Sequence, residues 1–139
     1  MPRTKMAYVL GQIEEISQKY GYRIANVFHA GDGNLHPLIL YNDDVEGALE
    51  TVEEIGGEIL KICVEVGGSL SGEHGIGSDK KCYMPLMFNK TDLETMQWVR
   101  SVFNPKGLAN PEKIFPIPRT CGESANIQQV KKFEGAEVF

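Results

Sequence analysis

The strongest constraint on the fold is a segment in which two strand-like stretches are separated by only a few residues. These stretches are residues 22–29 and 34–41, which are rich in β-branched, aromatic and aliphatic side chains, and Asp32-Gly33 lies between them. Asp-Gly is a strong hairpin signal, because a type I′ turn requires positive φ at both central positions. Pro37 removes one ladder donor and favours an edge strand or a bulge. The sequence therefore predicts an antiparallel hairpin with Asp32-Gly33 at the centre of its turn.

Three other stretches have the apolar spacing that is typical of amphipathic helices. The first covers residues 5–20 and the second covers residues 44–66. The third is expected to begin at a Thr91 N-cap, with Glu94 at the capping-box position, and to run to Phe103. In this helix the large apolar side chains, the single tryptophan among them, are expected to face the core.

The order helix, hairpin, helix, loop, helix predicts an α+β fold, with helices on one face of a small antiparallel sheet. The 139 residues and the 42% hydrophobic content suit one domain with one core. Two strands are too few for a stable sheet. Either further strands escape the pattern or the partners of these strands lie outside the chain.

Composition excludes several classes of function. A formal net charge of −5 gives no general footprint for DNA or RNA, so no nucleic-acid partner is expected. The chain has no apolar run long enough to span a membrane and no signal-peptide core, which predicts a cytoplasmic location. Cys63, Cys82 and Cys121 are odd in number and widely spaced, which argues against a disulfide framework or a zinc knuckle. Cys63 fits the apolar stripe of the second helix and is expected to be buried.

The histidines mark the candidate site, because all three lie in two glycine-rich segments. A turn centred as described above places His29 directly opposite His36 on one face of the hairpin. Two imidazoles at that separation can chelate one divalent ion. Glu73, from the second glycine-rich segment, would complete a His₂Glu set with one open position.

The open position could hold a substrate oxygen, in which case the metal acts as a Lewis acid. His74 follows Glu73, and if it is not a ligand its imidazole is the natural general base. The residues themselves leave other interpretations open. The histidines can be a packed structural pair beside a turn-capping glutamate. The set can also serve a metal-binding or subunit-interaction module without chemistry, or a metallohydrolase that activates water.

Longer motifs surround these residues. They are HAGDGNLH at 29–36, GGSLSGEHGIG at 67–77, NPKGLANPEKIF at 104–115 and FPIPRTCGE at 115–123. Together they resemble the C-terminal region of the FAD-linked oxidase and 2-hydroxyacid dehydrogenase family, the vanillyl-alcohol-oxidase-like flavoproteins. The last motif is similar to the glycolate oxidase branch of that family. The resemblance covers residues 1–123 and implies a ferredoxin-like substrate or cap domain there, incomplete in its strands. Residues 124–139 match no motif and are expected to form a polar tail.

The family resemblance implies oxidation of a small 2-hydroxy acid such as glycolate or D-lactate. Hydride would pass from carbon 2 of the substrate to FAD, while a base takes the hydroxyl proton. His29, His36 and Glu73 fall on metal-ligand positions, for an ion such as Zn or Mn. His74 falls on the base, and Asn110 falls where the tail segment of the family returns toward the flavin.

The resemblance also implies partners. The FAD-binding domain of the family precedes this region and is too large for this chain, so we expect a C-terminal fragment that is inactive alone. Further partners would be iron–sulfur subunits of a glycolate oxidase complex, which would also provide any peripheral contact with the inner membrane. An exposed apolar sheet edge would favour homo-oligomers. Two departures from the family pattern are Asn104 in place of Asp and Glu112 in place of Gly, while Lys80 and Arg100 fall on basic positions of no derived role.

Overall fold

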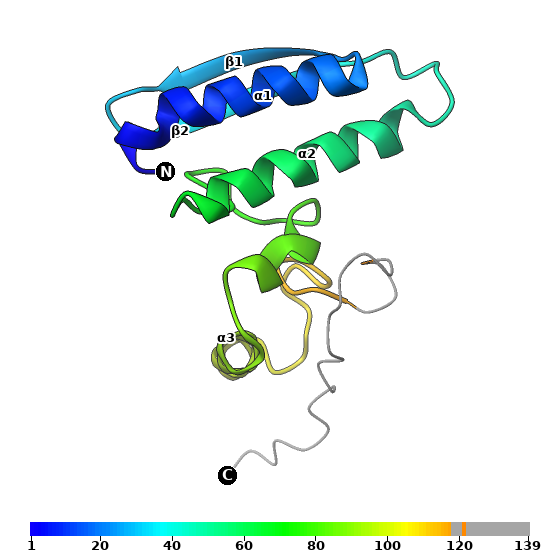
Figure 1. Cartoon of the computed structure of the whole chain (residues 1–139). Coiled ribbons are helices and arrows are strands. Elements are labelled where there is room, and N and C mark those ends of the chain that lie inside the picture. Colours follow the sequence, from blue (N-terminus) through cyan, green and yellow to red (C-terminus); the bar gives the residue numbers. More distant parts are fainter. Residues whose placement is uncertain (118–120, 122–139) are drawn as a thin grey trace. The chain divides into compact units, whose positions relative to one another are not determined.

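The computed structural model describes residues 1–117 and residue 121, and the chain divides into two compact units (Figure 1). The first unit is Met1–Gly75 and the second begins at Ile76. The first contains η1 (Arg3–Lys5), α1 (Met6–Tyr20), β1 (Arg23–His29), β2 (Asn34–Leu40) and α2 (Ala48–Glu65), and the second contains η2 (Lys81–Leu86) and α3 (Lys90–Phe103). Helices and a two-stranded antiparallel sheet confirm the predicted α+β fold. The expected tail at 124–139 lies outside the described residues.

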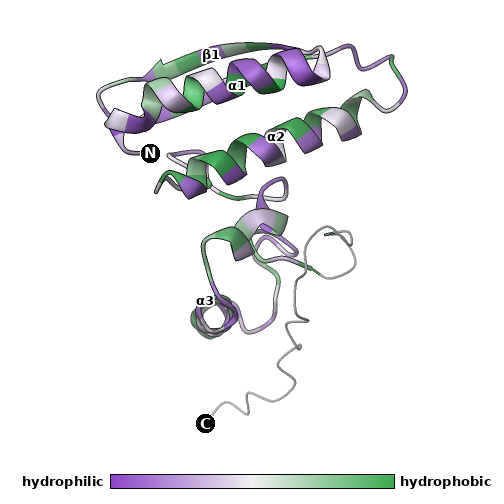
Figure 2. Cartoon of the chain, viewed as in Figure 1, coloured by the Kyte–Doolittle hydropathy of each residue, from purple (hydrophilic) through white to green (hydrophobic). Residues whose placement is uncertain are grey.

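The core of the first unit forms between its two long helices. Val9 and Ile13 of α1 and Ile55 and Ile59 of α2 are almost completely buried in one cluster. Partly buried side chains from the sheet pack against this cluster, among them Ile24, Leu35 and Ile39. Hydrophobic and hydrophilic residues alternate along both helices, as the amphipathic pattern requires (Figure 2). The sheet therefore has one face toward the helices, and α1 lies against both β1 and α2 (Figure 1).

Helix α1 has nearly the predicted bounds, but α2 begins four residues later than predicted. Gly21 ends α1 in the left-handed conformation, with φ of 73°. The expected start of the second helix at residue 44 is wrong, because α2 begins at Ala48. Gly47, with φ of 79°, precedes the helix, and Val45 N–H donates to the Asn42 carbonyl in a turn. The residues before Ala48 therefore connect strand and helix.

The predicted hairpin forms, but its register differs from the expected one. His29 pairs with Asn34, and His36 pairs with Val27. The expectation that His29 lies directly opposite His36 is therefore wrong by two residues. Because side chains alternate between the faces with a period of two, this shift leaves both histidines on the same face.

The turn explains the shift. Asp32 N–H donates to the His29 carbonyl at 3.0 Å, so the tight turn encloses residues 30–31. Within the loop 30–33, positive φ occurs only at Gly33, with a value of 70°. A type I′ turn centred on Asp32-Gly33 would need positive φ at Asp32 as well. The Asp-Gly signal thus located the hairpin correctly but misplaced the centre of its turn.

Helix α3 starts with a capping box two residues earlier than expected. The Asn89 side chain accepts a hydrogen bond from Asp92 N–H at 3.1 Å, and the Asp92 side chain accepts one from Asn89 N–H at 3.0 Å. The expected pair, Thr91 as N-cap with Glu94, is therefore wrong. Trp98 is 65% exposed, so its expected place in a core is also wrong within the part of the chain that the structure describes.

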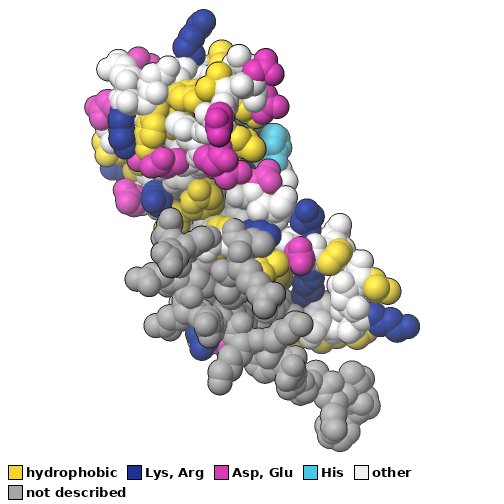
Figure 3. All heavy atoms as spheres, turned by 90° about the vertical axis from the view of Figure 1, so that its right-hand side faces the viewer, with side chains coloured by type: hydrophobic (Ala, Val, Ile, Leu, Met, Phe, Trp, Pro, Cys, Tyr) yellow, Lys and Arg dark blue, Asp and Glu magenta, His cyan; other side chains and the backbone are white. Residues whose placement is uncertain are grey.

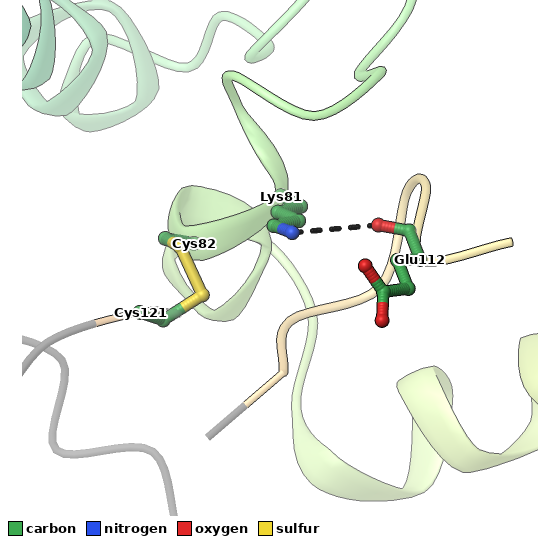
Figure 4. The surroundings of a disulfide bond; sticks show 4 residues. All are labelled: Lys81, Cys82, Glu112 and Cys121. Atoms are coloured by element: carbon green, nitrogen blue, oxygen red, sulfur yellow. Dashed lines mark hydrogen bonds between the residues drawn. A yellow bond between two sulfur atoms is a disulfide. The ribbon is translucent and has the colours of Figure 1, made fainter. Parts of the chain in front are cut away.

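The cysteines depart from the expectation as well. Cys82 of η2 and Cys121 form a disulfide, with their Cα atoms 5.2 Å apart (Figure 4). The expectation of no disulfide framework is therefore wrong for this pair, because the two cysteines are 39 positions apart in sequence and only the fold brings Cys121 back to η2. Cys63 is free and buried, as predicted, and burial raises the pKa of its thiol. Among the described residues, the helices are too short or too polar to cross a bilayer.

Candidate metal centre

The two hairpin histidines occupy the face of the sheet opposite to the one on which α1 and α2 pack. Ile24 and Ile39 are paired across the strands and pack toward the core, so strand alternation directs His29 and His36 to the opposite face. His29 stands at the end of β1 and is exposed, whereas the side chain of His36 is 20% exposed. Figure 3 shows histidine surface on this part of the molecule, with acidic and hydrophobic side chains close to it.

The imidazole rings of His29 and His36 meet across the hairpin despite the diagonal register. Their centroids are 5.4 Å apart and their planes are nearly perpendicular, at 88°. Diagonal partners on one face of an antiparallel pair remain within reach of ring side chains. The predicted meeting of the two imidazoles is therefore observed, although by a different pairing.

The glycine-rich loop after α2 brings a carboxylate to these rings. Glu73 Oε1 lies 2.9 Å from His36 Nε2. Gly72 lies next to Asn34 of β2, and a Cβ added there would require the end of the Asn34 side chain to move. The Ser71 hydroxyl accepts a hydrogen bond from Gly75 N–H at 2.8 Å and so closes the loop around Glu73.

Three ligand atoms, one from each of His29, His36 and Glu73, lie within 4.8 Å of one another. Zinc binds imidazole nitrogen and carboxylate oxygen at about 2.0–2.2 Å, so its ligand atoms are separated by up to about 4 Å. The limit of 4.8 Å is somewhat wider than this, so an ion would draw the three side chains closer together. The donor set and its spacing therefore fit one divalent ion.

Two further side chains border the cluster. Asn34 Nδ2 lies 3.3 Å from His36 Nε2, because the two residues are two positions apart in β2 and share one face of the strand. His74 Nε2 lies 3.6 Å from Glu73 Oε1, and its ring centroid is 5.2 Å from that of His36. The His74 side chain is 73% exposed. The structure thus places His74 beside the ligand set and in contact with solvent.

Asn110, the remaining predicted site residue, belongs to the second unit. It is exposed, and its φ of 44° is in the left-handed region. Arg100, a basic residue whose role the sequence did not reveal, donates hydrogen bonds to the carbonyl oxygens of Ala109, Asn110 and Lys113. A left-handed backbone at a non-glycine residue is unusual and gathers at functional positions.

Comparisons with known proteins match the segments that carry these residues. The family described as "FAD linked oxidases, C-terminal domain" matches residues 1–114. The glycolate oxidase subunit GlcD of Escherichia coli (strain K12) is 50% identical over 123 residues, which cover 88% of this chain and 25% of that protein. The GlcD subunit of Bacillus subtilis (strain 168) is 35% identical over 115 residues, with 83% and 24% covered. A D-lactate dehydrogenase of Archaeoglobus fulgidus is 34% identical over 116 residues, with 82% and 25% covered. The chain thus spans about a quarter of the length of these curated relatives.

Proposed function

This chain belongs to the FAD-linked oxidases and matches their C-terminal domain, and from this premise we propose that it forms the substrate-binding part of an FAD-dependent 2-hydroxyacid dehydrogenase or oxidase. The observation that carries the proposal is the cluster of His29, His36 and Glu73, whose ligand atoms lie within 4.8 Å. The names of the relatives, glycolate oxidase subunit and D-lactate dehydrogenase, support glycolate or D-lactate as substrate.

His29, His36 and Glu73 would hold a divalent ion such as Zn²⁺ or Mn²⁺. Two imidazole nitrogens and a carboxylate leave at least one coordination position for a substrate oxygen. A bound ion supplies positive charge that orients the carboxylate and hydroxyl oxygens of a 2-hydroxy acid. Asn34 would be a polar neighbour of the ligand set, since its side chain lies beside that of His36.

His74 would act as the general base. Its ring lies beside the ligand set, so a substrate held there has its hydroxyl group within reach of an imidazole that the ion does not occupy. Bound FAD supplies the acceptor for the hydride that leaves carbon 2 of the substrate. We assign FAD mainly to a domain outside this chain, with Asn110 as the contribution of residues 1–123 to its binding, so that the chain is inactive alone.

The assembled protein would have further partners. Two of the relatives are named as subunits of glycolate oxidase, which supports assembly into a complex. Iron–sulfur subunits in such a complex would accept the electrons. Self-association through the exposed sheet remains a second, weaker route to assembly.

A chimera tests the proposed function directly. Replacing the matching 123 residues of the E. coli GlcD subunit with those of this chain should give a protein that oxidises glycolate or D-lactate, measured by dye reduction. His74→Gln should lower kcat by about 10²–10⁴ while metal binding persists, because it removes only the base. Glu73→Gln should abolish both the oxidation of substrate and the binding of metal. Glu50→Gln, at an exposed position on α2, is the matched control and should change neither.

Two outcomes of this experiment would contradict the proposal. One is a folded chimera that binds FAD but oxidises neither 2-hydroxy acid. The other is an unchanged rate in Glu73→Gln. Metal binding without oxidation would favour the alternative, in which the site serves a metal-binding or subunit-interaction module without catalysis.

A further inference from the structure

The segment 109–114 in the second unit has an unusual backbone. Asn110, Glu112 and Ile114 have φ values of 44°, 61° and 76°, all in the left-handed region, although none of them is glycine. Side chains clash with the backbone in this region, so such residues persist only where their surroundings enforce the conformation. Three left-handed residues at alternate positions therefore require contacts with residues outside the segment to hold their backbone.

Arg100 of α3 supplies three of these contacts. Its Nη2 donates hydrogen bonds to the carbonyl oxygens of Ala109 and Asn110 at 2.7 and 2.6 Å. Its Nη1 donates to the Lys113 carbonyl at 3.0 Å. The planar guanidinium group offers five N–H donors in a fixed geometry, which suits binding to several carbonyl groups at once.

Lys81 of η2 supplies a fourth contact from another direction. Its Nζ lies 3.4 Å from the carbonyl oxygen of Glu112 (Figure 4). Lys81 is only 9% exposed, an unusual position for a lysine. Arg100 and Lys81 therefore bind four of the five carbonyl groups of residues 109–113, all except that of Pro111.

Two other contacts close the ends of the segment. The Asn104 side chain accepts from Ala109 N–H at 3.1 Å and donates to the Ala109 carbonyl at 3.2 Å. At the other end, Ile114 N–H donates to the Gly77 carbonyl at 2.8 Å. Residues outside the segment thus hold it at both ends and along its length, and the segment carries the exposed Asn110.

We propose that Arg100 and Lys81 are positioning residues, which bind the carbonyl groups of residues 109–113 and thereby hold Asn110 in its left-handed conformation for contact with the flavin cofactor. This rests on the proposed function, which gives Asn110 its role. In this proposal Arg100 and Lys81 act through the backbone carbonyl groups that they bind. The clamp itself is a property of this chain and can be measured without FAD.

Hydrogen exchange in the whole 139-residue chain tests the clamp. In Arg100→Lys, the amides of Ala109 and Ile114 should exchange at least about tenfold faster than in the unmodified chain, because the compact ammonium group lacks the fixed planar geometry of the guanidinium. Lys106→Ala, which removes a nearby cation outside the clamp, should leave both amides unchanged. Methylguanidinium added to Arg100→Ala should restore their protection, and methylammonium should not. Unchanged exchange in Arg100→Lys, or equal rescue by both cations, would overturn the clamp.

The chimera tests the link to the cofactor. Arg100→Lys and Asn110→Ala should shift the flavin absorbance spectrum in the same direction and lower kcat more than they change KM. Faster exchange combined with an unshifted flavin spectrum in both variants would overturn the cofactor link. A chimera that oxidises no 2-hydroxy acid would contradict the proposed function, and the exchange experiment would still decide the clamp.

Discussion

Single residues decide how the loops around the candidate site close. Gly33 has φ of 70°, and a Cβ added there would collide with the Met1 carbonyl oxygen. Gly72 is under a weaker constraint, because a Cβ added there would meet the end of the Asn34 side chain, which can move aside. A close backbone approach thus explains the glycine at position 33, at the turn between the histidines. This physical requirement is visible only in the structure.

Gly33→Ala should therefore destabilise the hairpin. The left-handed backbone alone costs a non-glycine residue about 1–2 kcal/mol, and the collision with Met1 adds to this cost. The lower conformational entropy of the unfolded chain stabilises the alanine variant by only about 0.4–1 kcal/mol. Urea denaturation measures the difference in the free energy of unfolding.

Gly31→Ala is the matched control for this substitution. It lies in the same loop, but its φ is not positive and an added Cβ meets nothing within 4 Å. It should be neutral or slightly stabilising. Equal destabilisation by both substitutions would show that the conformation of Gly33 is not what constrains the turn.

At the level of elements, α1 and α2 are tied by one carboxylate as well as by their apolar core. Lys19 Nζ lies 2.6 Å from Glu58 Oε1, and the Tyr20 hydroxyl donates to the same oxygen at 2.9 Å. The hydrogen bond from Lys19 holds the pKa of Glu58 below its usual value of 4.5. A lowered pKa in the folded chain means that the ionised form of Glu58 stabilises it.

This contribution to stability should depend on pH. It is fully present above pH 4.5, the usual value, and is lost as the pH falls through the lower pKa of the folded chain. Glu58→Gln should therefore unfold at a lower temperature than the unmodified chain at pH 7, and the two unfolding temperatures should converge under acid. Because the pair is exposed, added salt should shrink the difference. A gap that persists at acidic pH would contradict the assignment.

The elements also show which parts of the site could be predicted. Period-two alternation placed His29 and His36 on one face whichever even shift the register takes, so their shared face followed from the sequence. The actual pairing with Asn34 and Val27 did not, since it depends on a turn that Asp32-Gly33 does not centre. Likewise, apolar spacing located α3 but could not choose between two capping boxes, because both Asn89 and Thr91 precede an acidic residue by three positions.

At the level of the molecule, the family could be recognised from the sequence, but contacts between distant segments could not. The motif around Glu73 belongs to a loop, and no local rule predicts that a loop 37 residues after His36 returns to it (positions 36 and 73). The Cys82–Cys121 disulfide escaped prediction for the same reason. Composition and the count of cysteines constrain such contacts only weakly.

The face of the sheet that carries the candidate histidine ligands also carries exposed apolar side chains. Val27, Leu38 and Leu40 are each at least half exposed there, on the face that also carries His29 and His36. An apolar surface beside a polar ligand set is what a site completed by a second domain requires. The chain covers about a quarter of its relatives, which leaves ample length for a flavin-binding domain in those proteins.

The most direct test of this account is titration of the whole chain with Mn²⁺ or Zn²⁺ by calorimetry at neutral pH. We predict one ion per chain. In His36→Ala the affinity should be at least about 100-fold weaker, because losing a ligand should cost at least as much affinity as losing a residue that only hydrogen-bonds to a ligand. His29→Ala and Glu73→Gln should behave in the same way, and His74→Ala, which spares the ligand set, should bind like the unmodified chain. No binding of either ion, or unweakened binding in His36→Ala, would contradict the metal centre on which the proposed function depends.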